Sequence, residues 1–257
     1  MPGKIRVRDS LIGSLTRLFA RSAKLVELAF FPSFCKVCRA LLETPGEKIL
    51  CRSCLEKIRT HRSSFCLCCG RFFEGAVEPH LCLSCLNERP PFSVHRSGGQ
   101  YRGELKDAIL LFKYRGYEIL GKPLGRFLFE SLKGEESLWW GVDAIVPVPL
   151  HSKRKRERGF NQAKILAEEL SRLKNLPLEE LILRKMKNVP AQTSLEREER
   201  AKNVRGAYAV LKGGKIRGKT VLLVDDVYTT GSTLKECSRE LLKAGAKEIR
   251  AITIAQA

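Results

Sequence analysis

The sequence predicts an α/β protein that is built on a parallel sheet and preceded by a small cysteine-rich module. Three observations support this prediction. Beyond residue 90, short β-rich segments alternate with helical segments of roughly 10 to 15 residues, a pattern typical of parallel sheets. Of the ten cysteines, all but Cys237 lie between Cys35 and Cys85. The chain of 257 residues is 44% hydrophobic, which suffices for a packed core.

Residues 1–31 are expected to form an amphipathic helix. Between Leu11 and Leu28, apolar residues recur at roughly helical spacing, with Arg and Lys between them. Two interpretations stay open: the helix packs on its own protein, or it lies on a membrane surface or a partner. The charges interrupt any signal-peptide core, and no apolar run approaches the roughly 18 to 20 residues of a membrane span. We therefore expect a cytoplasmic protein without a transmembrane segment.

Residues 32–90 are expected to form a double zinc ribbon. Each of two repeats contains two CxxC pairs separated by twelve residues, and the second repeat follows the first at a distance of 31 residues. Two such pairs can surround one ion with four thiolates, which describes a closed, structural zinc site. Disulfides are disfavoured because the cytosol keeps thiols reduced. The predicted ligands are Cys35, Cys38, Cys51 and Cys54 in the first repeat, and Cys66, Cys69, Cys82 and Cys85 in the second.

The spacing leaves the metal arrangement open. Either each repeat binds its own zinc, which gives about two ions per chain, or the two repeats are cross-braced. Iron–sulfur ligation and dithiol redox chemistry are weaker alternatives for the same cysteines. Cys68 and Cys237 fall outside the repeated pattern and are expected to be small, buried apolar residues.

Residues 91–257 are expected to form the α/β domain. Pro90 and Pro91 make a stiff joint before it. In parallel α/β sheets, ligands bind beyond the carboxyl ends of the strands, so the segments that follow predicted strands are the candidates for chemistry. The expected elements are two helices within 101–129, a strand at 143–148, a helix at 161–173, a strand at 181–185, a strand at 221–224, a helix at 232–244 ended by Gly245, and a strand at 248–254.

The most informative segment is 221–233, which reads VLLVDDVYTTGST. A buried strand delivers the carboxylates of Asp225 and Asp226 to its carboxyl end, where they can accept hydrogen bonds from the vicinal hydroxyls of a sugar. The turn that follows precedes a helix and can offer N–H groups and hydroxyls to a phosphate. The segment therefore predicts a ribose 5-phosphate site. The expected phosphate-binding residues are Thr229, Thr230, Gly231, Ser232 and Thr233.

This segment resembles the signature of type I phosphoribosyltransferases, whose members bind 5-phosphoribosyl 1-pyrophosphate with Mg²⁺. The resemblance extends to KYRG at 113–116, DAIVPVPLHSKRKRERGFNQA at 143–163 and QTSLEREERAKNVRG at 192–206. Together with the doubled cysteine repeat, these segments resemble the ComF family of competence-associated proteins. That resemblance implies a type I phosphoribosyltransferase-like domain behind a zinc-ribbon module, with Asp225 and Asp226 at the catalytic site.

The resemblance also implies roles for basic residues. The loop after the strand at 143–148 corresponds to the pyrophosphate-facing loop of the family, and the segment 188–206 resembles the mobile loop that covers the site. A solvated surface and a contact with nucleic-acid phosphates are alternative interpretations of the basic loop. The predicted pyrophosphate-binding residues are Lys153, Arg154, Arg158 and Lys185, with Lys155 and Arg156 beside them.

The charge balance leaves two functions open. Lys and Arg number 47 against 28 Asp and Glu, and the resulting net charge of +19 attracts polyanions. In the first hypothesis, the protein binds phosphoribosyl pyrophosphate and transfers its sugar to an unknown acceptor, as a glycosyltransferase. In the second, the same scaffold binds single-stranded DNA without catalysis. The family's association with natural transformation implies this role, with DNA-uptake proteins as candidate partners.

Overall fold

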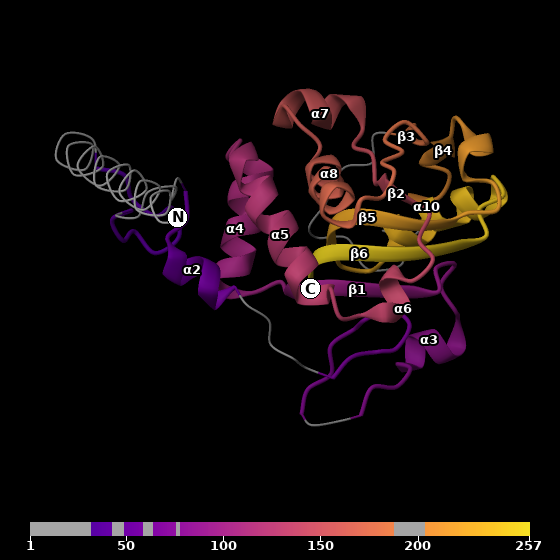
Figure 1. Ribbon diagram of the computed structural model, residues 1–257, viewed down its shortest axis with the longest axis horizontal. Coiled ribbons are helices and arrows are strands. Elements are labelled where there is room, and N and C mark those ends of the chain that lie inside the picture. Colours follow the sequence, from indigo (N-terminus) through magenta and orange to yellow (C-terminus); the bar gives the residue numbers. More distant parts are fainter. Residues whose placement is uncertain (1–31, 43–48, 59–63, 76–77, 188–203) are drawn as a thin grey trace, which may run out of the picture. The chain divides into compact units, whose positions relative to one another are not determined.

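The computed structural model describes residues 32–42, 49–58, 64–75, 78–187 and 204–257 (Figure 1). Contacts divide the chain into two compact units, and the boundary falls between Lys57 and Ile58. The second cysteine repeat therefore belongs to the same unit as the sheet, although the sequence suggests a joint near residue 90. The helix expected within 1–31 lies outside the described residues.

The first unit contains the first cysteine repeat. An antiparallel bridge between Phe34 and Leu41 closes its first knuckle, and α2 (Arg52–Lys57) begins directly after Cys51. The amide of Lys36 donates a hydrogen bond of 2.9 Å to the carbonyl of Ile49. This bond joins the two CxxC segments of the repeat.

A four-stranded sheet forms the centre of the second unit. Its strand order is β1-β6-β5-β2, and every neighbouring pair is parallel, as the alternation of strands and helices predicts. Within β5, Val224 pairs with Ile252 of β6 on one side and with Pro147 of β2 on the other. The strands are β1 (Val94–Gln100), β2 (Ala144–Pro147), β5 (Thr220–Tyr228) and β6 (Glu248–Gln256).

Two helices, α5 (Gly121–Leu132) and α8 (Gln162–Lys174), pack together on one face of this sheet (Figure 1). Their backbones approach closely, because a Cβ atom on Gly121 would lie 2.3 Å from Cγ2 of Ile165. Only a residue without a side chain fits there.

The opposite face of the sheet packs against α10 (Ser232–Lys243). Leu234 and Cys237 of this helix share a buried cluster with Val221 and Leu223, which are alternate residues of β5. The second cysteine repeat contributes to the same cluster through Cys66, Cys68, Cys69, Cys82 and Cys85.

Shorter elements complete the unit. They are α3 (Leu83–Asn87), α4 (Gly103–Tyr114), α6 (Glu136–Trp139), α7 (Ser152–Arg158), the antiparallel pair β3 (Leu183–Lys185) and β4 (Tyr208–Val210), and the 3₁₀ turns η1 (Glu118–Leu120) and η2 (Gly213–Ile216). Within the described residues, no helix has the length and apolar character that a membrane span requires.

The strand β1 is missing from the sequence prediction. Its sequence, VHRSGGQ, is polar and contains two glycines, neither of which favours a strand. The strand is nevertheless buried, because contacts from distant segments satisfy its polar side chains. Arg96 pairs with Glu135 at 3.1 Å, for example, and the hydroxyl of Ser97 lies 2.8 Å from that of Thr253.

The basic segment after β2 is helical and not the predicted loop. The side chain of His151 accepts a hydrogen bond of 3.3 Å from the amide of Lys153 and so caps the start of α7. Gly159 ends the helix with a φ of 84°. Lys, Arg and Glu favour helices, so the six such residues that follow Ser152 carry a helical signal between the two caps.

Candidate functional site

The carboxylates of Asp225 and Asp226 lie near the carboxyl end of β5, as predicted. Both acids are largely buried, and the amide of Asp226 donates a hydrogen bond of 2.8 Å to Oδ1 of Asp225. Asp225 pairs with Thr253 of β6 in the sheet register. The two acids therefore stand at the edge where parallel α/β sheets bind their ligands.

A lysine for which the sequence predicted no role forms an ion pair with one of the two acids. Lys113, near the end of α4, places Nζ 2.8 Å from Oδ1 of Asp226, and the side chains of both residues are largely buried. Burial alone would lower the pKa of Lys113, but the charge of Asp226 raises it above its ordinary value. The segment KYRG attracts notice in the sequence, yet nothing in the sequence pairs it with an acid 113 residues later.

The two carboxylates differ in their partners. Asp226 has the ammonium of Lys113, whereas burial and the neighbouring charge of Asp226 raise the pKa of Asp225 to about 7. A group that titrates near neutral pH can gain or lose a proton when a ligand binds. Such perturbed acids are typical of functional sites.

The turn that follows β5 contains the predicted phosphate-binding residues. Gly231 has a φ of 75° and immediately precedes α10. Thr230 and Ser232 turn their hydroxyls toward one another at 2.9 Å. The amides and hydroxyls of residues 229–233 thus gather at the N-terminus of a 12-residue helix.

Of the predicted basic residues, Lys185 interacts with the charge of Asp225, and Arg154 and Arg158 interact with Lys185. Lys185 of β3 is attracted by the charge of Asp225 and repelled by those of Arg154 and Arg158 of α7. Burial, together with these two arginines, lowers the pKa of Lys185. Arg158 also donates to Oε1 of Gln162 at 3.2 Å. The side chain of Lys153 is exposed, and its role remains a prediction.

The candidate loop at 188–206 is described only from residue 204 onward, so residues 188–203 lie outside the described residues. Within the described part, the amide of Gly206 donates a hydrogen bond of 2.6 Å to Oε1 of Glu236. This bond attaches the end of the segment to α10.

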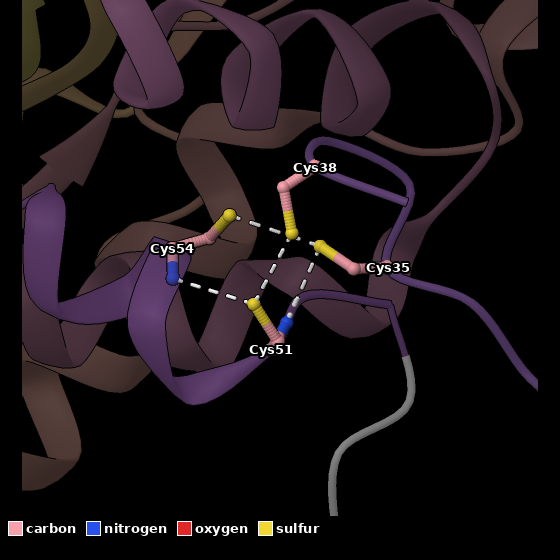
Figure 2. A group of neighbouring side chains, drawn as sticks. All are labelled: Cys35, Cys38, Cys51 and Cys54. Atoms are coloured by element: carbon pink, nitrogen blue, oxygen red, sulfur yellow. Dashed lines mark hydrogen bonds between the residues drawn. The ribbon is translucent and has the colours of Figure 1, made fainter. Parts of the chain in front are cut away.

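The first four cysteines form a compact cluster, which Figure 2 shows with its sulfurs turned toward one another. The Sγ atoms of Cys35 and Cys54 lie 3.8 Å apart, and those of Cys38 and Cys51 lie 3.5 Å apart. Four ligands at 2.3 Å from a tetrahedral zinc would be separated by about 3.8 Å. The residues present therefore fit a zinc ion.

The second four cysteines repeat this geometry. The sulfurs of Cys69 and Cys82 lie 3.7 Å apart, and all four ligand atoms of the cluster fall within 4.8 Å of one another. Because each repeat assembles its own cluster, the cross-braced alternative is not adopted. Although burial opposes it, hydrogen bonds from backbone amides lower the pKa of Cys66 to about 6, which favours the thiolate that zinc requires.

The internal repeat extends to the backbone. The amide of Cys35 donates to the carbonyl of Ala40, and 31 residues later the amide of Cys66 donates to the carbonyl of Arg71, each at 2.8 Å. The bridge between Phe34 and Leu41 likewise recurs between Phe65 and Phe72. The two ribbons are thus copies of one fold.

Two family models match the chain. A phosphoribosyl transferase domain matches residues 126–257, and a double zinc ribbon domain matches residues 27–86. Competence protein ComFC of Bacillus subtilis is 31% identical over 213 residues, which cover 80% of this chain and 83% of that protein. Competence protein F of Haemophilus influenzae is 33% identical over 162 residues, covering 62% and 71%. DNA utilization protein YhgH of Escherichia coli is 30% identical over 163 residues, covering 63% and 71%.

Solved structures give weaker matches. A purine phosphoribosyltransferase from Pyrococcus horikoshii is 23% identical, covers 53% of this chain and 72% of its own, and has a TM-score of 0.33. Glutamine phosphoribosylpyrophosphate amidotransferase from B. subtilis is 22% identical, covers 55% and 26%, and has a TM-score of 0.34.

The two cysteine clusters predict about two zinc ions per purified chain. Cys38→Ser and Cys69→Ser, which alter equivalent positions of the two repeats, should each remove about one ion. Metal analysis by mass spectrometry measures both numbers. A wild-type content near one would mean that one of the clusters does not bind zinc.

The raised pKa of Asp225 predicts a pH-dependent stability. Since its ordinary value is 3.8, the folded protein holds a proton that the unfolded chain releases between about pH 4 and pH 7, and stability falls as the pH rises through this range. Asp225→Asn should therefore raise the melting temperature at pH 8 by a few degrees, at roughly 2 to 4 °C per kcal/mol. At pH 4 it should change little.

The control is Asp226→Asn, which leaves the buried ammonium of Lys113 without its carboxylate and should lower the melting temperature at pH 8. Differential scanning calorimetry compares the two variants. A destabilised Asp225→Asn variant at pH 8 would contradict the inferred cost of ionising this acid.

Proposed function

Because this chain belongs to the ComF family, which joins a double zinc ribbon to a phosphoribosyltransferase domain, we propose that it binds 5-phosphoribosyl 1-pyrophosphate and transfers the phosphoribosyl group. The observation that carries the proposal is the convergence of three kinds of group at one edge of the sheet. Acids and a phosphate-type turn lie at the end of β5, and cations of β3 and α7 lie nearby. They correspond to the three parts of that ligand.

In the proposed complex, Asp225 and Asp226 accept hydrogen bonds from the two ribose hydroxyls. Lys113 orients the carboxylate of Asp226 through their 2.8 Å ion pair. The ligand should lower the pKa of Asp225, because hydroxyl donors stabilise its charged form. Thr229, Thr230, Gly231, Ser232 and Thr233 bind the 5-phosphate at the N-terminus of α10.

The pyrophosphate would lie toward α7 and β3. Lys185, Arg154 and Arg158 supply positive charge there, and Lys153 adds to it at the exposed side of α7. Mg²⁺, when bound with the ligand, would neutralise part of the pyrophosphate charge and make it a better leaving group.

The proposed transfer needs no nucleophilic side chain. The lone pair of a nitrogen on the acceptor forms the new bond to the anomeric carbon, the bond from that carbon to the pyrophosphate oxygen breaks, and the oxygen keeps the electron pair. The nitrogen releases its proton. This chain's residues contribute by orienting the sugar and by stabilising the charge that develops on pyrophosphate.

The first test uses Asp225→Asn, which is expected to be a stably folded variant. It should weaken binding of phosphoribosyl pyrophosphate with Mg²⁺ at least tenfold, because a hydrogen bond to a charged group contributes roughly 1.5 to 3 kcal/mol and a factor of ten is about 1.4 kcal/mol. Isothermal titration calorimetry at pH 8 measures the affinity. Wild-type protein that does not bind the compound, or a variant that binds it equally well, would refute the assignment.

The charge and exposure of α7 favour a second candidate function, the binding of single-stranded DNA. This helix has no buried residue, and its sequence SKRKRER carries five cations. Relatives of the chain are named competence and DNA utilization proteins. We propose that a cytoplasmic protein of this kind contacts incoming strands, delivered by DNA-uptake proteins, through the phosphate groups that α7 attracts.

The second test measures how DNA affinity depends on salt. If each cation of α7 neutralises one phosphate, the five contribute about −3.5 to the slope of log K against log salt, at roughly −0.7 per contact. Replacing all five with Ala should flatten the slope by about that amount, as measured by fluorescence anisotropy with labelled oligonucleotides.

The matched control removes the same charge from exposed lysines elsewhere, namely Lys122, Lys133, Lys212, Lys243 and Lys247. This control should retain most of the slope. If both quintuple variants change the slope equally, DNA follows the overall charge of the protein and α7 is not its binding site.

A further inference from the structure

The two zinc ribbons carry different residues at one position where their backbones have the same conformation. Arg39 and Gly70 occupy equivalent positions in the two repeats, and each has a φ of 66°. The first repeat tolerates a side chain there. In the second, a Cβ atom would lie 2.5 Å from the carbonyl oxygen of His95 in β1. The glycine is therefore required by a close contact with the sheet, in addition to the turn.

His95 fastens the second ribbon to the edge of the sheet. Its amide donates a hydrogen bond of 2.7 Å to the carbonyl of Cys68, and Nδ1 lies 2.8 Å from the carbonyl of Cys69. Since a carbonyl can only accept, Nδ1 carries the proton, and Nε2 faces the hydroxyl of Thr253 at 3.0 Å. The imidazole is fully buried, and these contacts fix its orientation.

The same imidazole stacks on Tyr228, the last residue of β5. The ring centroids are 4.3 Å apart and the rings are inclined by 23°. Tyr228 in turn covers the phosphate-type turn, because a Cβ atom on Gly231 would lie 2.6 Å from its Cζ atom. A continuous path of contacts thus runs from a zinc-ligand residue to the start of α10.

A shared cavity provides a second link. Cys69 and Cys85 of the ribbon line it together with Tyr228, Thr229 and Thr230. The second ribbon and the phosphate-type turn therefore form adjoining walls of one space.

We propose that the second zinc ribbon is a structural part of the phosphate site, and that its cluster holds the turn 229–233 in its binding conformation through His95 and Tyr228. The identity of the ligand rests on the proposed function, whereas the connection between ribbon and turn rests on these contacts. A turn that spends less time in the competent conformation binds its ligand more weakly by the same factor.

The experiment compares equivalent cysteines of the two ribbons. Cys69→Ser disrupts the second cluster, and Cys38→Ser disrupts the first, which belongs to the other compact unit. Zinc content, amide hydrogen exchange of peptides covering 229–236, and affinity for phosphoribosyl pyrophosphate with Mg²⁺ are measured on each. Cys69→Ser should speed exchange in these peptides and weaken binding at least tenfold, while Cys38→Ser should leave both within twofold of wild type.

A second pair of variants keeps all the cysteines. It therefore tests the contact between His95 and Tyr228 without unfolding the ribbon. Tyr228→Leu removes the stacked ring, and Tyr228→Phe preserves it. With full zinc content, the leucine variant should show the same faster exchange and weaker binding, and the phenylalanine variant should remain close to wild type. Equal behaviour of these two variants would overturn the role of the stacked ring.

The outcomes also distinguish this proposal from the proposed function. If the wild type does not bind phosphoribosyl pyrophosphate, the proposed function fails, but the exchange measurements still test the connection. If the wild type binds and the two cysteine variants show equal exchange at 229–236, the connection fails and the proposed function stands.

Discussion

The parallel pairing of β5 with β6 on one side and β2 on the other is the constraint on which the candidate site depends. Parallel strands end at the same edge, so the acids of β5, the turn before α10 and the helix after β2 must all emerge there. An antiparallel neighbour would send its following segment to the far edge. Because β5 is an inner strand and its residues 221–224 are buried on both faces, the core that stabilises the sheet also fixes the position of the site.

Two charged groups at this edge of the sheet have pKa values shifted toward their neutral forms. Asp226 has a nearby ammonium, whereas Asp225 stays beside a like charge in a buried setting that raises its pKa to about 7. Lys185 is held with two arginines around it and has a lowered pKa. In the proposed complex, a ligand that carries hydroxyls and phosphates would stabilise the charged forms of both groups, and perturbed pKa values of this kind are typical of functional sites.

The two ribbons illustrate how a duplicated unit acquires a new contact without a new fold. Their cysteine spacing, backbone hydrogen bonds and left-handed turn residues recur at the same interval. One difference between them lies at the equivalent residues Arg39 and Gly70. Gly70 meets the backbone of β1, and the knuckle that it closes supplies two carbonyls to His95. The metal cluster and the sheet consequently share one hydrophobic core.

The sequence by itself determined the parts of the protein that are encoded locally. The cysteine spacing predicts two four-thiolate clusters, VLLVDD predicts a buried strand that ends in acids, and TTGST before an amphipathic segment predicts the turn and α10, because each pattern lies within a few consecutive turns or one repeat. Tertiary structure alone decided the rest. The polar strand β1 forms because Thr253 and the knuckle carbonyls satisfy its side chains, Lys113 reaches Asp226 because α4 packs near the end of β5, and Tyr228 covers Gly231 beneath His95. Except for the contact between Tyr228 and Gly231, these contacts join residues that are far apart in the chain, and neither hydrophobic periodicity nor motif spacing carries information about such pairs.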